Sequence, residues 1–276
     1  MKKICQIHTE SPVNLQRPKD VRLILLGLPG AGKSSSGNTI LGSEQFRTGC
    51  DFLSVSREVV SKHAEVRGRR VTVVDTPGFG AEGFTPEQQF EQLRDAMIEC
   101  APGPHAFVLV IKIGRISEVD CKLLQLLSEV FDTDLKYVTL LFTHKDRLKG
   151  RSLQRLIETT PPLKELLQKC GGRYNVFNNE QRADVRQVQR LLHTVDLMHQ
   201  ENRRHYTLDM LAEKHALALS LSHSGKSSIG QEVMEFFSNV WEAIKQFFIQ
   251  IFECIQAWLK RKGIVGNMEY KKMKNN

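Results

Sequence analysis

The sequence lacks the features that mark disulfide-bonded, zinc-binding and membrane-spanning proteins. Its six cysteines are scattered without a Cys-x-x-Cys pair, which argues against a zinc site or a disulfide framework and fits a reducing compartment. It has no uncharged apolar run of about 18 residues, the length that a spanning helix needs. The first residues hold Lys2 and Lys3 but no long apolar stretch, and a lysine at position 2 excludes the N-myristoylation pattern. We therefore expect a cytoplasmic protein without a secretory signal.

The positive charge is partly concentrated at one end of the chain. The 276 residues carry a formal net charge of +8, and six lysines and arginines against Glu269 give residues 260–276 a charge of +5. Such a tail is most often solvated, although it can touch an anionic membrane, and we expect no nucleic-acid partner. The hydrophobic content of 41% is ordinary for a globular protein, and the length allows one large domain with or without an appendage.

Residues 27–34 form a complete Gly-x-x-x-x-Gly-Lys-Ser phosphate loop. An apolar run at 21–26 precedes it and a helix-compatible segment follows it, which is the strand–loop–helix setting that the motif requires. The glycines let successive backbone N–H groups point at phosphate oxygens, Lys33 is expected to reach the β- and γ-phosphates, and Ser34 to bind Mg²⁺. The nucleotide-binding residues predicted here are Gly27, Leu28, Pro29, Gly30, Ala31, Gly32, Lys33, Ser34 and Ser35.

A second motif, Asp75-Thr76-Pro77-Gly78, ends a predicted strand at 70–75. The Asp75 carboxylate can hold Mg²⁺ directly or through water, and Gly78 can offer its N–H to a γ-phosphate. A turn that closes a strand is the simpler interpretation of these four residues taken alone. Their place about 40 residues after the phosphate loop favours a role in the nucleotide site.

A third motif, Thr143-His144-Lys145-Asp146, follows a predicted strand at 137–142. The Asp146 carboxylate can accept hydrogen bonds from the N1–H and N2–H groups of guanine, a donor pair that adenine lacks. The stem of Lys145 can lie across the base. In register with the first two motifs, His144, Lys145 and Asp146 predict a site that selects GTP over ATP.

Strand-like and helix-like segments alternate from residue 21 onward. The expected strands are 21–26, an edge strand within 55–66, 70–75, 106–113, 137–142 and 174–177. The expected helices are 33–41, 86–100, 117–131, an interrupted helix at 151–170, and 184–200. The run at 106–113 is almost continuously apolar, as is typical of a central parallel strand. The alternation predicts an α/β fold of the P-loop NTPase type, with a doubly wound, mostly parallel sheet and flanking helices.

Taken together, the motifs resemble those of a known family. In chain order they are Gly27–Ser35, Asp75–Gly78, Pro102-Gly103-Pro104-His105-Ala106-Phe107, Thr143–Asp146 and Arg173-Tyr174-Asn175-Val176-Phe177-Asn178-Asn179. They are similar to those of the GTPases of immunity-associated proteins (the GIMAP family), relatives of septins and plastid import GTPases. The box at 102–107 discriminates best, because ordinary Ras-like GTPases lack it. The resemblance spans roughly residues 20–212 and implies a G domain that binds GTP, GDP and Mg²⁺.

The resemblance also implies roles for residues outside the three motifs. Asn178 lies in the segment that closes over the base in the family, and Thr48 matches a family position that contacts the nucleotide. Ser56 stands where a switch threonine is common, and its hydroxyl can still approach Mg²⁺. Some family members supply an arginine across a nucleotide-dependent dimer from the segment around Arg115. Arg115 is therefore a candidate catalytic residue acting in trans, with an exposed charge at the start of a helix as the alternative.

The sequence favours slow hydrolysis and leaves the function class open. No glutamine follows Asp75–Gly78 to position an attacking water, and Glu82 is the only polar candidate within 79–84. One class is a GTP-dependent, self-assembling switch that slowly hydrolyses GTP to GDP and phosphate. The alternative is a nucleotide-stabilised binding or scaffold module with little or no hydrolysis. An ATP-using P-loop enzyme is disfavoured by Asp146.

Seven large apolar residues repeat at helical spacing near the C-terminus: Phe237, Trp241, Ile244, Phe248, Ile251, Ile255 and Trp258. This stripe can lie in an anionic membrane interface, fold back on the G domain or pair with another copy, and the sequence does not decide among the three. The predicted organisation is a flexible arm at 1–20, a G domain at 21–212, a linker at 213–233, an amphipathic helix at 234–262 and a basic tail at 263–276. Expected partners are guanine nucleotide, further copies of the chain and an intracellular membrane surface.

Overall fold

The computed structural model describes residues 17–48, 58–78, 86–114, 116, 121, 124 and 131–213. Apart from residues 17–20 and 213, the predicted arm, linker, C-terminal amphipathic helix and basic tail lie outside this set. Ser56, Glu82, Arg115 and most of the predicted helix 117–131 also lie outside it.

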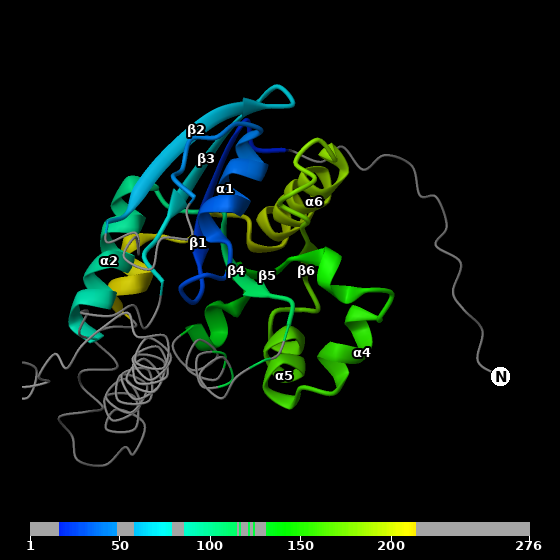
Figure 1. Ribbon diagram of the computed structural model, residues 1–276. Helices are drawn as coiled ribbons and strands as arrows, with labels where there is room; N and C mark the ends of the chain where they lie inside the picture. The colour runs from blue at the N-terminus through cyan, green and yellow to red at the C-terminus, as the bar shows by residue number, and fades with distance from the viewer. Residues whose placement is uncertain are drawn as a thin grey trace, which may run out of the picture.

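Within the described residues, the strands form one six-stranded sheet (Figure 1). The strands are β1 (Asp20–Leu26), β2 (Val60–Val66), β3 (Arg69–Asp75), β4 (Ala106–Lys112), β5 (Val138–Thr143) and β6 (Tyr174–Val176). Their order across the sheet is β2-β3-β1-β4-β5-β6. β2 runs antiparallel to β3 at the edge, and all other neighbours are parallel. The predicted α/β architecture is therefore confirmed.

The described helical segments connect these strands. They are α1 (Lys33–Leu41), α2 (Pro86–Glu99), the 3-10 turn η1 (Asp132–Tyr137), the 3-10 turn η2 (Lys145–Leu148), α4 (Leu153–Glu158), α5 (Pro161–Lys169) and α6 (Val185–Asn202). The interruption predicted within 151–170 falls between α4 and α5. Pro161 and Pro162 begin α5. Proline is tolerated at the first positions of a helix because a backbone N–H there would have no acceptor within the helix.

The central strands are buried on both faces. In β1, Leu23 and Leu25 pack with α1 and α6, whereas Ile24 and Leu26 pack with α2, α4 and α5 on the opposite face. Successive side chains of a strand point to opposite faces, so a strand covered on both sides must be apolar throughout. This accounts for the uninterrupted apolar runs of β1 and β4 and gives the sheet two helical layers (Figure 1).

The topology brings the motifs to one edge of the sheet. β1 lies between β3 and β4, and its carboxyl end leads into the phosphate loop. The second and third motifs follow the carboxyl ends of β3 and β5, which are parallel to β1 within the same sheet. Ligands of open α/β sheets bind at this carboxyl edge, where strands on either side of a central strand lead their loops apart.

Candidate phosphate-binding site

The phosphate loop turns sharply between β1 and α1. Gly27, Gly30 and Gly32 have φ angles of +145°, +72° and +94°, which L side chains rarely adopt. A Cβ atom at Gly27 would come 2.4 Å from the carbonyl oxygen of Val110 in β4. The loop therefore needs glycine at position 27 both for its conformation and for its close approach to the neighbouring strand.

Lys33 begins α1 and extends its side chain back under the loop. Its Nζ donates hydrogen bonds to the carbonyl oxygens of Gly27 and Leu28 at 3.2 and 3.1 Å, and the residue is only 7% exposed. Burial lowers the pKa of Lys33 to about 8, and the nearby Asp75 carboxylate opposes this shift. Hydrogen bonds from an ammonium to anionic phosphate oxygens are stronger than those to neutral carbonyl oxygens. A bound phosphate can therefore replace the two backbone carbonyls as the partner of Lys33.

Ser34 joins the first motif to the second. Its Oγ donates a hydrogen bond to Oδ2 of Asp75 at 2.5 Å. Burial raises the pKa of Asp75, whereas the Ser34 hydrogen bond and the Lys33 charge lower it. The other carboxylate oxygen, Oδ1, is buried and has no hydrogen-bond partner among the described residues. A hydroxyl beside a carboxylate with an unsatisfied oxygen fits Mg²⁺, a hard cation that binds through one or two protein oxygens together with water and phosphate.

The chain after Asp75 folds against the phosphate loop. The Thr76 hydroxyl donates to the carbonyl oxygen of Leu25 at 2.7 Å, which fixes the loop after β3 to the end of β1. A Cβ atom at Gly78 would lie 2.4 Å from the backbone nitrogen of Pro29. The contact requires a glycine, and it places Gly78 directly beside the phosphate loop, as its predicted role demands.

The third motif contacts the phosphate loop from the other side. The Thr143 hydroxyl donates to the carbonyl oxygen of Ala31 at 2.7 Å. His144 adopts a left-handed conformation with φ +58°, after which Lys145 and Asp146 enter the short turn η2 on the surface. Burial, with a smaller contribution from nearby cations, lowers the pKa of His144, which keeps this ring neutral at neutral pH. Thr143 thus ties the third motif to the phosphate loop, and the side chains of Lys145 and Asp146, which follow it, are exposed.

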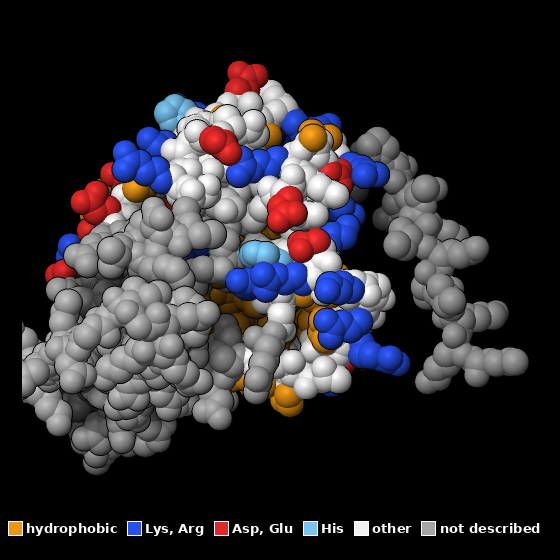
Figure 2. Space-filling view, in the orientation of Figure 1, with side chains coloured by type: hydrophobic (Ala, Val, Ile, Leu, Met, Phe, Trp, Pro, Cys, Tyr) orange, Lys and Arg blue, Asp and Glu red, His pale blue; other side chains and the backbone are white. Residues whose placement is uncertain are grey.

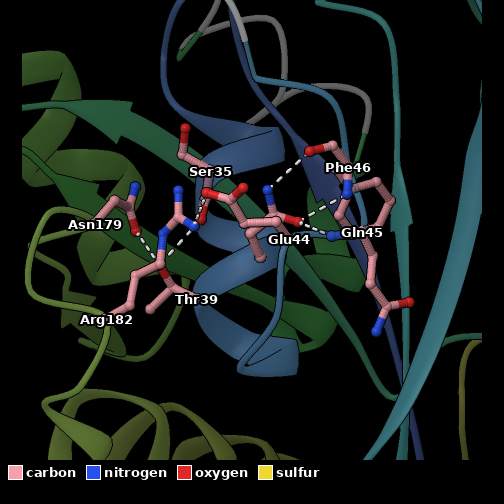
Figure 3. A network of polar contacts seen from close by, with 8 residues as sticks. Ser35, Thr39, Glu44, Gln45, Phe46, Asn179 and Arg182 are labelled. Atoms are coloured by element: carbon pink, nitrogen blue, oxygen red, sulfur yellow. Dashed lines mark hydrogen bonds and ion pairs between the residues drawn. The ribbon is translucent and has the colours of Figure 1, made fainter.

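The loop after β6 is fixed to α1, the helix that follows the phosphate loop, through a residue that the sequence analysis did not select as a site residue. Asn179 accepts a hydrogen bond from the Thr39 hydroxyl at 2.9 Å (Figure 3) and donates to the Ser36 hydroxyl at 3.1 Å. Asn178, the predicted guanine contact, instead uses its Oδ1 to accept the Glu180 N–H at 3.1 Å. Asn178 and Asn179 are adjacent residues of the same type, so the sequence did not indicate which of the two side chains faces α1.

Thr48 follows a segment that is anchored to α1. The side-chain amide of Asn38 donates to the carbonyl oxygen of Phe46 and accepts its N–H, both at 2.8 Å. The Phe46 ring packs so closely over Gly37 that a Cβ atom there would lie 2.7 Å from it. Thr48 is exposed two residues beyond this anchor. Ser56 and Arg115 lie outside the described residues, so the structure does not place them.

A cavity of about 470 Å³ opens beside the phosphate loop. Its walls include Pro29 and Gly30 of the loop, Lys112 at the end of β4 and Arg147 of η2. Neither cation belongs to a motif, and the sequence analysis did not select them. The signal available was their position, because each lies at or just beyond the carboxyl end of a strand that borders the site.

The box at 102–107 lies at the opposite edge of the sheet. His105 accepts a hydrogen bond from the Arg22 N–H at 3.1 Å, and the carbonyl oxygen of Pro104 accepts the Tyr206 N–H at 2.9 Å. Burial, helped by the Arg22 charge, lowers the pKa of His105 to about 3. The box therefore holds the segment after α6 against the sheet and takes no part in the phosphate-binding site.

The sheet is mostly parallel, and its strand β1 leads through the glycine loop into α1, with a buried lysine and a Ser–Asp pair beside the loop. These features define a P-loop domain of the G-domain type. Solved structures of Toc33 from Arabidopsis thaliana share the fold. A dimerization-deficient mutant has a TM-score of 0.54 at 16% identity and covers 68% of this chain and 88% of its own. The complex with Mg²⁺ and GMPPNP has a TM-score of 0.52 at 17% identity and covers 68% and 89%.

The chain belongs to the AIG1 family, whose sequence profile matches residues 21–224. Mouse GTPase IMAP family member 8 is 33% identical over 195 residues, which cover 68% of this chain and 28% of the relative. Arabidopsis immune-associated nucleotide-binding protein 13 is 30% identical over 200 residues, which cover 69% and 60%. The match thus spans less than a third of the mouse relative and three fifths of the plant one. The family resemblance predicted from the motifs is confirmed.

No helix among the described residues has the length and apolar character needed to cross a membrane.

Proposed function

We propose that this protein binds GTP and GDP with Mg²⁺ and acts as a GTP-dependent, self-assembling switch with slow GTP hydrolysis. The observation that carries the proposal is the convergence of three motifs on one loop. Gly78 lies against Pro29, and the Thr143 hydroxyl binds the Ala31 carbonyl. These contacts join residues far apart in sequence around a single phosphate-binding turn.

Each motif receives one role in nucleotide binding. The backbone N–H groups of residues 30–34 and the Lys33 ammonium bind the phosphates. Ser34 and Asp75 hold Mg²⁺, which when bound neutralises phosphate charge. Asp146 selects guanine through its N1–H and N2–H groups, and Lys145 lies across the base. The family resemblance adds Thr48, Asn178 and Ser56 as further contacts.

Two observations support self-assembly: the absence of a glutamine after the second motif, and the dimerization described for structural neighbours. No glutamine follows the second motif, so a single copy lacks the residue that orients the attacking water in Ras-like enzymes. Among the solved neighbours, at a TM-score of 0.52, are chloroplast translocon components, and dimerization is important for the GTPase activity of atToc33 and psToc159. We propose that a second copy of this chain supplies Arg115 to the phosphates in trans.

GTP turnover measured against protein concentration tests the switch. The rate per molecule should rise with concentration, and Arg115→Ala should abolish the rise while leaving GTP affinity unchanged. Arg94→Ala, which removes an exposed arginine from α2, is the matched control and should behave as the wild type. Tight GTP binding with turnover that stays flat and near zero would favour the alternative function, a nucleotide-stabilised binding or scaffold module.

We also propose a cytoplasmic location with peripheral attachment to an intracellular membrane through the predicted helix 234–262. Lys260-Arg261-Lys262 would add about 1 kcal/mol per charge near an anionic surface. Full-length protein should co-sediment with phosphatidylserine vesicles at low salt, and a chain truncated after Ser224 should not. Full-length protein that remains in the supernatant, together with a truncated domain that unfolds more easily, would show that the helix packs on the G domain.

A further inference from the structure

A second pocket, lined by arginines, lies at the amino edge of the sheet. Its polar lining residues are Arg17, Arg67, Arg69, Gln189, His193 and Asp196, and its volume is about 250 Å³. We call it the arginine pocket. Arg69 begins β3, and β1 runs parallel to β3 before it reaches the phosphate loop. The seven residues of β1 span about 20 Å, so the arginine pocket is separate from the nucleotide site.

A buried ion pair forms the floor of the arginine pocket. The two terminal nitrogens of Arg69 donate to the two carboxylate oxygens of Asp196 at 3.0 and 2.7 Å, and its Nε donates to the carbonyl oxygen of Pro18 at 2.9 Å. The side chains of Arg69 and Asp196 are 13% and 5% exposed. Such a bidentate pair has a fixed geometry, so the position of the floor is set by the fold.

The remaining charge of the pocket is positive. Arg17 lies 3.8 Å from Asp196, whose two oxygens already accept hydrogen bonds from Arg69. Arg67, at the exposed tip between β2 and β3, faces the neutral amide of Gln189, whose oxygen accepts from its guanidinium when the amide is oriented to satisfy both groups. Three guanidinium groups against one carboxylate leave these four side chains a formal charge of +2.

The surface around α6 carries charges of both signs. Figure 2 shows Lys and Arg side chains gathered at the upper right of the molecule, where Figure 1 places α6, with some acidic side chains among them. Within the pocket itself, three arginines stand against one carboxylate. The pocket is therefore a concave, positively charged site, whereas a purely structural ion pair would balance its charge.

We propose that the arginine pocket binds a phosphate group, either free in solution or on a lipid headgroup. Guanidinium groups match phosphate oxygens through paired N–H donors, and arginine is over-represented where phosphate is bound in this way. The pocket is smaller than the roughly 300–1,000 Å³ typical of sites for drug-sized ligands, which suits a compact anion. Arg67 and Arg17 bind the anion, and Arg69 is a positioning residue held by Asp196.

The test uses the full-length protein saturated with Mg²⁺ and GDP, so that the phosphate loop is occupied. Inorganic pyrophosphate is titrated by calorimetry, and phosphatidylcholine vesicles with and without phosphatidylinositol phosphate are tested by co-sedimentation. Arg67→Gln keeps the exposed position and the backbone conformation while removing the charge. The matched control is Arg190→Gln, which removes an exposed arginine that does not line the pocket.

Arg67→Gln should weaken binding of the phosphate probe about tenfold, the effect of losing a charged hydrogen bond, whereas Arg190→Gln should change it less than about twofold. An Arg67-dependent loss with pyrophosphate identifies a free anion, and a loss confined to the phosphoinositide vesicles identifies a lipid headgroup. Absence of binding in both arms, or equal binding by the wild type and both variants, would overturn the proposal.

Discussion

Lys33 is expected to make nucleotide binding depend on pH in a direction that its burial dictates. The fall of its pKa from 10.5 to about 8 means that burying the ammonium costs about 3 kcal/mol below pH 8. Because the folded pKa is below the unfolded one, the unfolded chain binds more protons between pH 8 and 10.5. The free energy of unfolding of the nucleotide-free protein should therefore rise with pH across this window, and Lys33→Met should remove that rise.

A bound phosphate should raise the pKa of Lys33 again, because an anionic partner favours the charged form of the lysine. Affinity for GDP should then fall about tenfold between pH 7 and pH 9, as the free protein loses the proton that the complex needs. Calorimetry in buffers of different ionisation enthalpy should detect proton uptake near pH 9. Lys164→Met, which removes an exposed lysine on α5, should retain the uptake. A GDP affinity that stays constant over this range, without proton uptake, would refute the argument.

Three further predictions concern the loops around the phosphate site. Asp146→Asn should shift preference from guanine to xanthine nucleotides, measured by competition binding, since the 2-oxo group of xanthine accepts where guanine donates. Thr143→Val should cost about 1 kcal/mol of unfolding free energy by deleting the bond to the phosphate loop, and Thr143→Ser should restore it in denaturant titrations. Gly78→Ala should weaken GTP binding, because its Cβ would collide with Pro29, whereas Gly114→Ala, with its nearest neighbouring atom 4.0 Å away, should bind normally.

The fold could be predicted from the sequence because the pattern of apolar and polar residues in a segment indicates which of its faces are buried. The apolar runs of β1 and β4 are long enough to form strands covered on both faces, and their order with the intervening helices leaves few topologies for a parallel sheet. The edge position of β2 was also predictable, since its 55–66 segment mixes polar and apolar residues. The three motifs could be placed together because they follow parallel strands of one sheet.

The side-chain partners could not be predicted in the same way. Thr143 and Ala31 are 112 positions apart, and Arg69 and Asp196 are 127 apart. Nothing within either segment of such a pair encodes the other. Asn179 was missed for a related reason, since a step of one residue in a loop changes the direction of the side chain, and only the docking of this loop on α1 decides which asparagine faces it.

The sequence by itself determined the phosphate loop, because residues 27–34 are contiguous and their glycines permit the positive φ angles that the loop needs. It determined the family and the alternation of strands and helices for the same reason, as each motif and each apolar run is read within one short segment. The tertiary structure alone decided the buried state of Lys33, the unsatisfied oxygen of Asp75 and the arginine pocket. Desolvation and charge depend on which distant segments pack together, and that packing is a property of the folded chain.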